Sequence, residues 1–252
     1  MAIRLSGALD VSALRAAVAD LIGRHESLRT VYPETDGVAS QVIMPAVQVV
    51  PDVIPVPVRV EDVSSQVIDV VSAGFDVTSE VPLRAALFEI DDNEHVLVFV
   101  VHHIAGDGFS MGPLTRDVMV AYSARTRGQA PGWEPLAVQY ADYTLWQRSV
   151  LGSEDDPESV IAQQIDYWST TLAGMPEQLD LPADRPRPAR QSFVGSSTMF
   201  DIDADTHGAL VELARTHNTT LFMVVHSVLA VFLSRLSGAS DIAVGTPHCR
   251  PW

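Results

Sequence analysis

The stretch Val96-Leu97-Val98-Phe99-Val100-Val101-His102-His103 is apolar at six consecutive positions and then ends on two histidines. A strand that is apolar at every position is buried on both faces, so it belongs in the middle of a covered sheet. A second apolar run, Pro82–Ile90, precedes it, and Asp91-Asp92-Asn93-Glu94 joins the two runs. This arrangement predicts a β-hairpin at the centre of the fold.

The segments around the hairpin predict a mixture of helices and strands. Asp10 is the predicted N-cap of a helix whose apolar face holds Leu14, Val18, Leu21 and Ile22. Further helices are expected over residues 61–73, 111–127, 140–150, 159–172, 205–216 and 219–236. Strands are expected over 27–32, 39–44 and 197–202 and from 242 onward, whereas the proline-containing segment 47–60 is expected to be a loop or an edge strand. The fold class is therefore α/β or α+β.

Length and composition limit the function classes. The 252 residues, 47% of them hydrophobic, suffice for one large domain or two lobes with a core. Four prolines within residues 176–190 predict an extended linker. No apolar run reaches the ~18–20 residues of a membrane span, and no secretory signal is visible. The single cysteine, Cys249, suits a reducing cytoplasm. The net charge of −16 argues against nucleic acid and anionic membrane as partners.

The two histidines at the end of the buried run form the candidate site. Neighbouring strand residues point to opposite faces, so one of His102 and His103 should face the interior and the other a cleft. A histidine suits proton transfer because its ordinary pKa of ~6.5 lies near neutrality. Asp107 follows in a short loop, where Gly106 and Gly108 would allow tight backbone angles. The pattern alone leaves two interpretations open, a catalytic histidine and a satisfied core histidine.

Four motifs resemble those of one family, the condensation domains of non-ribosomal peptide synthetases. His102–Ser110 resembles the family's HHxxxDGxS motif, and Arg24–Thr30 resembles RHExLRT. Tyr140–Gln147 resembles YxDYAxW, with Thr144 in place of the alanine, and Leu181–Pro188 resembles the family's linker phrase. The motifs occur in the family's order and the resemblance covers almost the whole chain.

The resemblance implies a chloramphenicol-acetyltransferase-like fold of two lobes with a tunnel between them. Residues 1–175 would be a nearly complete first lobe, 176–196 the proline-rich linker, and 197–252 the truncated start of the second lobe. The implied activity is amide-bond formation between a carrier-bound aminoacyl or peptidyl thioester donor, of the L-configured type, and a carrier-bound aminoacyl acceptor. The implied partners are donor and acceptor peptidyl carrier domains and an adjacent adenylation domain. The 4′-phosphopantetheine belongs to the carriers, so no cofactor or metal is expected on this chain.

The resemblance also implies roles for single residues. The second histidine of the motif, His103, would face the tunnel, either as a general base or to orient the amine, and these alternatives stay open. The Gly108 N–H would be a donor to the developing oxyanion. His102 would be structural, and Asp107 would pair with an arginine and hold the loop. The candidates for that arginine are Arg24, Arg29, Arg84 and Arg250, and Arg24 and Arg29 are expected to be structural at the site.

The end of the chain departs from the resemblance. After residues 241–247 the family would continue with Ile-Ala-Gly-Arg, whereas this chain reads His-Cys-Arg-Pro-Trp. One possible set of codons for this ending encodes Ile-Ala-Gly-Arg when the bases are read one position later. We therefore expect that an extra base has shifted the reading frame and truncated the protein. A chain truncated in this way is expected to be inactive. Two other interpretations stay open. One is a non-catalytic remnant that at most docks a carrier, and the other is a related acyltransferase that esterifies an alcohol.

Overall fold

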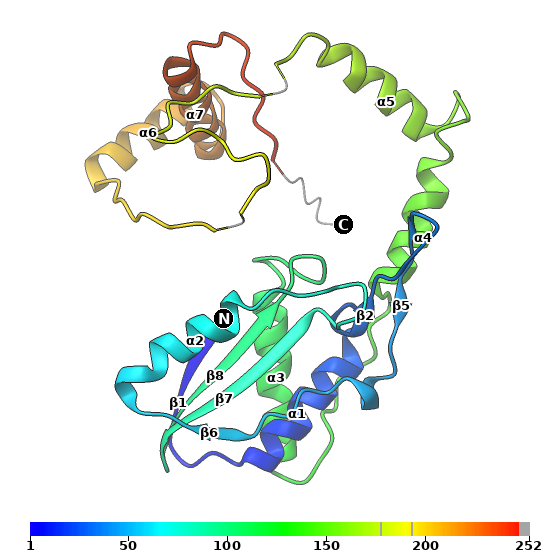
Figure 1. The fold of residues 1–252 in the computed structure, drawn as a ribbon, viewed down its shortest axis with the longest axis vertical. Helices are drawn as coiled ribbons and strands as arrows, with labels where there is room; N and C mark the ends of the chain where they lie inside the picture. Colours follow the sequence, from blue (N-terminus) through cyan, green and yellow to red (C-terminus); the bar gives the residue numbers. More distant parts are fainter. Residues whose placement is uncertain (177, 193, 247–252) are drawn as a thin grey trace. The chain divides into compact units, whose positions relative to one another are not determined.

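The computed structural model describes residues 1–176, 178–192 and 194–246, and it divides into two compact units, 1–153 and 154–252. The first unit contains a four-stranded sheet in the order β1-β8-β7-β6 (Figure 1). β8 (Glu94–Val101) pairs antiparallel with β1 (Ala2–Ser6) on one side and β7 (Leu83–Asp91) on the other. β6 (Pro55–Pro57) runs parallel to β7 at the edge. The predicted hairpin, its central strand and the proline-containing edge strand are therefore confirmed.

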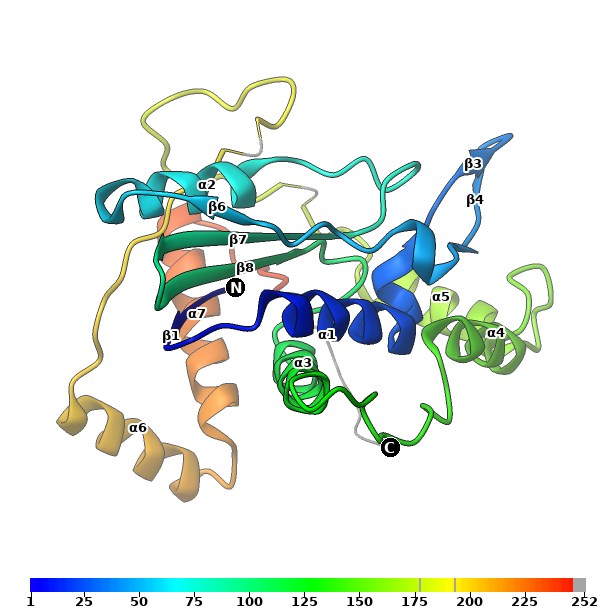
Figure 2. The same cartoon turned by 90° about the horizontal axis from the view of Figure 1, so that it is seen from below.

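Helices cover both faces of this sheet, with α2 (Val63–Ser72) on one face and α1 (Val11–Arg24) and α3 (Met111–Arg125) on the other (Figure 2). Side chains of β8 alternate between the two layers. Leu97 and Phe99 pack into the cluster formed with α1 and α3, whereas Val96 and Val98 pack into the cluster beneath α2. The residues that continue this strand consequently leave it toward different layers.

α1 begins where its sequence predicts, directly after Asp10. The Asp10 carboxylate accepts a hydrogen bond from the Ala13 N–H at 2.9 Å, which caps the helix. Its buried face includes the four residues that the periodicity identified, Leu14, Val18, Leu21 and Ile22, and in addition Ala13 and Ala17.

The strand predicted over residues 27–32 is wrong in its first part. The chain forms a 3-10 turn, η1 (Glu26–Arg29), and only then a short strand, β2 (Thr30–Val31). The Leu28 N–H donates to the His25 carbonyl at 3.2 Å and the Thr30 hydroxyl to the Glu26 carbonyl at 2.8 Å. This turn places the Leu28 side chain in the core beside α1.

A tight hairpin follows, formed by β3 (Glu34–Thr35) and β4 (Val38–Ala39). Asp36 and Gly37 close it with φ values of 53° and 79°, the left-handed conformation that two-residue hairpin turns require. β5 (Val42–Ile43) then pairs with β2, so the strand predicted over 39–44 is divided between β4 and β5. The remaining elements of this unit are η2 (Ala46–Gln48), η3 (Val60–Asp62) and α4 (Tyr140–Leu151).

The second unit contains the helices α5 (Val160–Thr171), α6 (Ala204–Thr216) and α7 (Leu221–Ser237), which the sequence predicted. The segment 197–202 is not the expected strand, and the described residues from 242 onward form none either. In neither segment does a neighbouring strand supply backbone partners. α7 contacts α6 but leaves Phe222, Val225, Leu229 and Phe232 exposed.

The two units meet after residue 153, which lies before the lobe boundary expected at residue 175. The lobe boundary itself stays a prediction. Within the described ranges, no single helix is long and apolar enough to cross a membrane. The pair α6 and α7, bent by 105°, passes that test by length and composition alone.

Candidate active site

His102 and His103 leave the end of β8 toward different surroundings. The His102 N–H donates to the Pro82 carbonyl at 2.9 Å, which extends the pairing with the neighbouring strand by one residue. The half-buried His102 ring meets Phe75 edge to face at 5.9 Å, and its Nδ1 accepts a hydrogen bond from the Ile104 N–H at 3.0 Å. The His103 ring is exposed and forms no hydrogen bond with the residues that the structure describes. One histidine is thus fixed and its neighbour is free.

Two successive turns follow the histidines. The Ala105 N–H donates to the His102 carbonyl at 2.9 Å, and the Ser110 N–H to the Asp107 carbonyl at 3.1 Å. Neither Gly106 nor Gly108 has a positive φ, so the expectation that both supply unusual backbone angles is wrong. Gly106 lies in a crowded place instead, because a Cβ there would lie 3.3 Å from the Cβ of Ser110 and Ser110 would have to move slightly, whereas a Cβ at Gly108 would meet nothing within 4 Å.

Asp107 holds the second turn without an arginine. Its carboxylate accepts hydrogen bonds from the Ser110 hydroxyl at 2.8 Å and from the Ser110 N–H at 3.0 Å. These two bonds, the hydroxyl first, lower the pKa of Asp107 from its ordinary value. The predicted Asp107–arginine pair is absent among the described residues, where three of the four candidates bind other partners; Arg250 lies outside that part of the chain.

Arg24 belongs to a buried ionic cluster between α1 and α3. The Asp117 carboxylate, 4% exposed, accepts from Arg24 Nε and contacts His25 Nε2, each at 2.9 Å, and it pairs with Arg116 at 3.1 Å. Burial acts to raise the pKa of Asp117, but the hydrogen bonds from His25, Arg24 and Arg116 outweigh it and the pKa is lowered. Sequence reasoning missed Asp117, although a carboxylate on the apolar face of α3 was a usable signal.

Arg29 and Gln139 hold the segment after α1. Arg29 donates to the Ile22 carbonyl at 3.2 Å and the Met44 carbonyl at 2.7 Å, and it pairs with Glu26. The Gln139 side chain accepts from the Glu26 N–H at 3.2 Å and donates to the Arg24 carbonyl at 3.0 Å. Since Gln139 also caps α4, these bonds connect the start of that helix to the turn after α1.

Arg84 and Phe75 support His102 from the α2 side of the sheet. The Arg84 guanidinium lies 4.3 Å from the centre of the Phe75 ring, a cation–π contact. It also donates to the carbonyls of Ala73 and Gly74, each at 3.0 Å. The backbone ahead of Phe75 is thereby held, and Phe75 limits the movement of the His102 ring.

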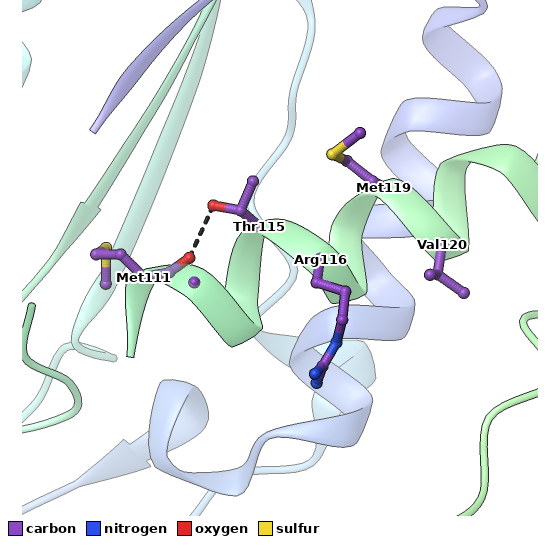
Figure 3. A pocket seen from close by; sticks show the side chains of 6 residues that line it. Met111, Thr115, Arg116, Met119 and Val120 are labelled. Atoms are coloured by element: carbon purple, nitrogen blue, oxygen red, sulfur yellow. Dashed lines mark hydrogen bonds between the residues drawn. The ribbon is translucent and has the colours of Figure 1, made fainter. Parts of the chain in front are cut away.

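His103 lines a hollow of about 360 Å³. The other walls of this hollow come from the turn after α1, the two turns that follow β8, and the start of α4. Their lining residues are Ser27, Ile104, Ala105, Gly106, Asp107, Ser110 and Tyr140. The Gly108 N–H, close by in the chain, donates to no described group. A larger hollow on the outer face of α3, lined by Met111, Thr115, Arg116, Met119 and Val120, contains neither histidine (Figure 3). The hollow at His103 is therefore the candidate active site, and the described residues contain no cluster of three or more side chains that could hold a metal.

The site thus combines a layered α/β unit with a histidine that follows a doubly buried strand and has no partner among the described residues. The model of the condensation-domain family matches residues 1–251. The chain is 49% identical over 252 residues to a probable non-canonical nonribosomal peptide synthetase, CymA, of Salinispora arenicola, covering 98% of this chain and 3% of the relative. It is 50% identical over 250 residues to an isonitrile lipopeptide synthase of Mycobacterium tuberculosis, covering 98% and 10%.

The fold is similar to that of the X-domain from teicoplanin biosynthesis, with a TM-score of 0.89 and 38% identity over 96% of this chain and 53% of that one. It is also similar to SgcC5 of Streptomyces globisporus, solved with a naphthyl-ethanediol, with a TM-score of 0.68 and 29% identity over 96% and 54%. The chain belongs to the condensation-domain family and has its chloramphenicol-acetyltransferase-like fold. It spans a small part of these curated relatives and about half of the solved chains.

Proposed function

We propose that this chain contributes the histidine-bearing half of a condensation domain that joins two carrier-bound substrates through an amide bond. The observation that carries the proposal is the exposed His103 ring. It has no partner among the described residues, and it lines a hollow beside the two turns that follow β8. His103 accepts a proton as the acceptor's amine nitrogen attacks the donor's carbonyl carbon, so that a C–N bond forms. The C–S bond then breaks, and the proton passes to the departing thiolate.

The neighbouring groups take supporting roles in this proposal. The Gly108 N–H donates to the oxyanion that develops on the carbonyl oxygen. His102, fixed by Phe75 and the Ile104 N–H, shapes the turn that carries His103. Asp107, bound to Ser110, holds the next turn, while Arg24 and Arg29 hold α1 and the turn after it.

The proposed partners are donor and acceptor peptidyl carrier domains, each bearing its substrate on 4′-phosphopantetheine, and an adjacent adenylation domain. The donor is proposed to be an L-configured aminoacyl or peptidyl thioester, and the site of action the cytoplasm. The support for these proposals is the identity with synthetases from two genera. The net charge of −16 disfavours nucleic acid and anionic membrane as partners.

An assay of amide formation between two loaded carriers tests the proposal. It is run on the 252-residue chain and on the chain joined to the sequence that follows the matching region in the isonitrile lipopeptide synthase of Mycobacterium tuberculosis. We expect product only from the joined protein, because the chain spans about half of the solved relatives. His103→Ala in the joined protein should lower the rate by ~10²–10⁴-fold, whereas His207→Ala, an exposed histidine on α6, should not change it. Equal rates for the two variants would contradict the role of His103.

A protein-binding role is the second candidate. It is favoured by the 38% identity to the teicoplanin X-domain, which has also been solved in complex with OxyB. A joined protein that binds a partner tightly, yet forms no amide or ester with loaded carriers, would favour this candidate. Ester formation with an alcohol acceptor, and none with an amine, would instead favour the related acyltransferase reaction, to which the diol bound by SgcC5 gives support.

A further inference from the structure

A second hollow adjoins the one at His103. It lies in the first unit, between α4 and the segment that forms the β3–β4 hairpin, and has a volume of about 770 Å³, which lies within the ~300–1,000 Å³ range of ligand sites. Ile104 and Tyr140 line both hollows. Since Ile104 directly follows His103, the two hollows form one continuous surface that ends at the candidate catalytic side chain.

Most of the lining of this second hollow is apolar or aromatic, and the rest is polar, with Ser40, Gln41, Thr144, Gln147 and Arg148. Val38 is 68% exposed, Leu145 70% and Tyr140 54%, and Tyr32 contributes another ring. Exposed apolar side chains that converge on a concave surface mark a binding site more often than isolated ones do. This part of the surface therefore suits an apolar or aromatic group.

The charge of the hollow differs from that of the whole chain. Although the chain has a net charge of −16, none of the residues that line the hollow is acidic. The charged group there is Arg148, whose guanidinium makes no hydrogen bond or ion pair with the described residues. A cationic group would meet repulsion and no carboxylate, so the hollow discriminates against it.

The walls are connected before any ligand binds. The Gln41 amide donates to the Thr144 hydroxyl at 3.2 Å, and that hydroxyl donates to the Tyr140 carbonyl at 3.0 Å. These bonds join the segment after β4 to the first turns of α4. A site whose walls are already joined loses less conformational freedom on binding.

We propose that this second hollow receives an aromatic or large apolar side chain of one substrate, while the reacting group of the same substrate lies at His103. The inference rests on the proposed function for the place of reaction, but the preference for side chains is a property of the hollow itself. Val38, Tyr140 and Leu145 would contact the side chain, and Arg148 would exclude lysine-like substrates.

Binding of four uncleavable analogues to the 252-residue chain tests the proposal. The probes are the amides of N-acetyl-ethylenediamine with L-phenylalanine, L-glutamate, L-lysine and glycine, titrated by calorimetry. The phenylalanyl analogue should bind about tenfold tighter than the glycyl analogue, because its ring is removed from water. The lysyl analogue should bind no tighter than the glycyl one.

Val38→Asp places a carboxylate in the hollow and should weaken the phenylalanyl analogue about fivefold while it strengthens the lysyl analogue. Val47→Asp is the matched control, because Val47 is 89% exposed and lines neither hollow. Four analogues that bind within about twofold of one another, the absence of saturable binding, or equal effects of the two variants would overturn the proposal. Equal binding of the analogues, or no saturable binding, is also the result expected if further polypeptide, and not a substrate, covers this surface.

His103→Ala separates this inference from the proposed function. The variant should keep the preference for the phenylalanyl analogue, because the side-chain hollow does not need the imidazole. If amide formation in the joined protein is insensitive to His103 but the preference persists, the proposed function fails alone. If amide formation depends on His103 and the analogues bind equally, the side-chain hollow fails alone.

Discussion

The two faces of the sheet support adjacent histidines in different ways. On the α2 face, His102 itself is held, by the Phe75 ring and the Ile104 N–H. On the other face, His103 has no partner within the described part of the chain, and the polar contacts belong to other residues, Asp107 in the turn that follows and Asp117 between α1 and α3. A free side chain can therefore keep a defined place when the chain around it is fixed, which is what a reacting group needs.

The largest expected effect comes from the ionic cluster on the α1–α3 face. Asp117→Ala leaves Arg24 and His25 without their buried carboxylate, and the free energy of unfolding should fall by ~3–5 kcal/mol. Urea denaturation at neutral pH measures it. Asp69→Ala, an exposed carboxylate on α2, is the control. A loss no greater than that of the control would mean that the cluster does not support this face.

Acid should act on the same cluster. The pKa of Asp117 is lowered in the folded state, so its contribution to stability is present above the ordinary carboxylate pKa of ~3.9. It is lost as pH falls through the lower, folded-state pKa. Denaturation at a series of pH values below about 4 should show a larger loss of stability in the unaltered chain than in Asp117→Ala, because other carboxylates with a lowered pKa, such as Asp107, act in both. Parallel curves for the two proteins would contradict the assignment.

Gly106 and Gly108, in the two turns that follow β8, offer a paired test of crowding near His103. Gly106→Ala should lower the unfolding free energy by about 1 kcal/mol, because the new Cβ lies close to Ser110 and Val101. Gly108→Ala should change it by less than about 0.5 kcal/mol, since open space surrounds that position. Thermal and urea melts of both variants measure the difference, and equal losses would show that the turn is not packed as described.

On the α2 face, Phe75→Ala removes the ring that lies between Arg84 and His102. The loss in unfolding free energy should be about 1–2 kcal/mol, because Phe75 is half-buried and its two ring contacts are individually small. Phe75→Tyr should restore most of it. If Phe75→Ala is neutral, then His102 is held by its hydrogen bond alone and the contrast between the faces becomes weaker.

The smallest expected effect concerns a histidine on the α1–α3 side of β8. His95 is 4% exposed, and its Nδ1 has no hydrogen-bond partner among residues 1–176, 178–192 and 194–246. Replacing it with Phe removes that unsatisfied atom, so the stability should stay within about 1 kcal/mol or rise slightly. A marked loss in a urea melt would reveal a partner for the His95 ring.

The sequence predicted the parts of the fold that depend on local pattern. The all-apolar run 96–101 indicated the central strand, and the period of Leu14, Val18 and Leu21 indicated α1. The alternation of neighbouring strand residues anticipated that His102 and His103 would differ. These predictions needed only the chain's own periodicity.

Partners distant in the sequence could not be predicted in the same way. Asp107 binds Ser110, three residues away, although a pairing with arginine was expected, and Arg24 finds Asp117 through the packing of two helices. The segment 197–202 has strand-like composition, but strand pairing depends on a neighbour that composition does not specify. The hollow beside Tyr140 likewise arises from the meeting of a hairpin segment and α4.

The prolines of β6 have a consequence for self-association. The Val58 N–H donates to the Glu89 carbonyl of β7 at 2.9 Å, so alternation directs the N–H of Val56 the same way and turns positions 55 and 57 outward. Both outward positions are prolines, which have no N–H to offer. A foreign β-strand that approaches this rim finds two of its expected donors missing, and the sheet is protected there against growing into neighbouring molecules.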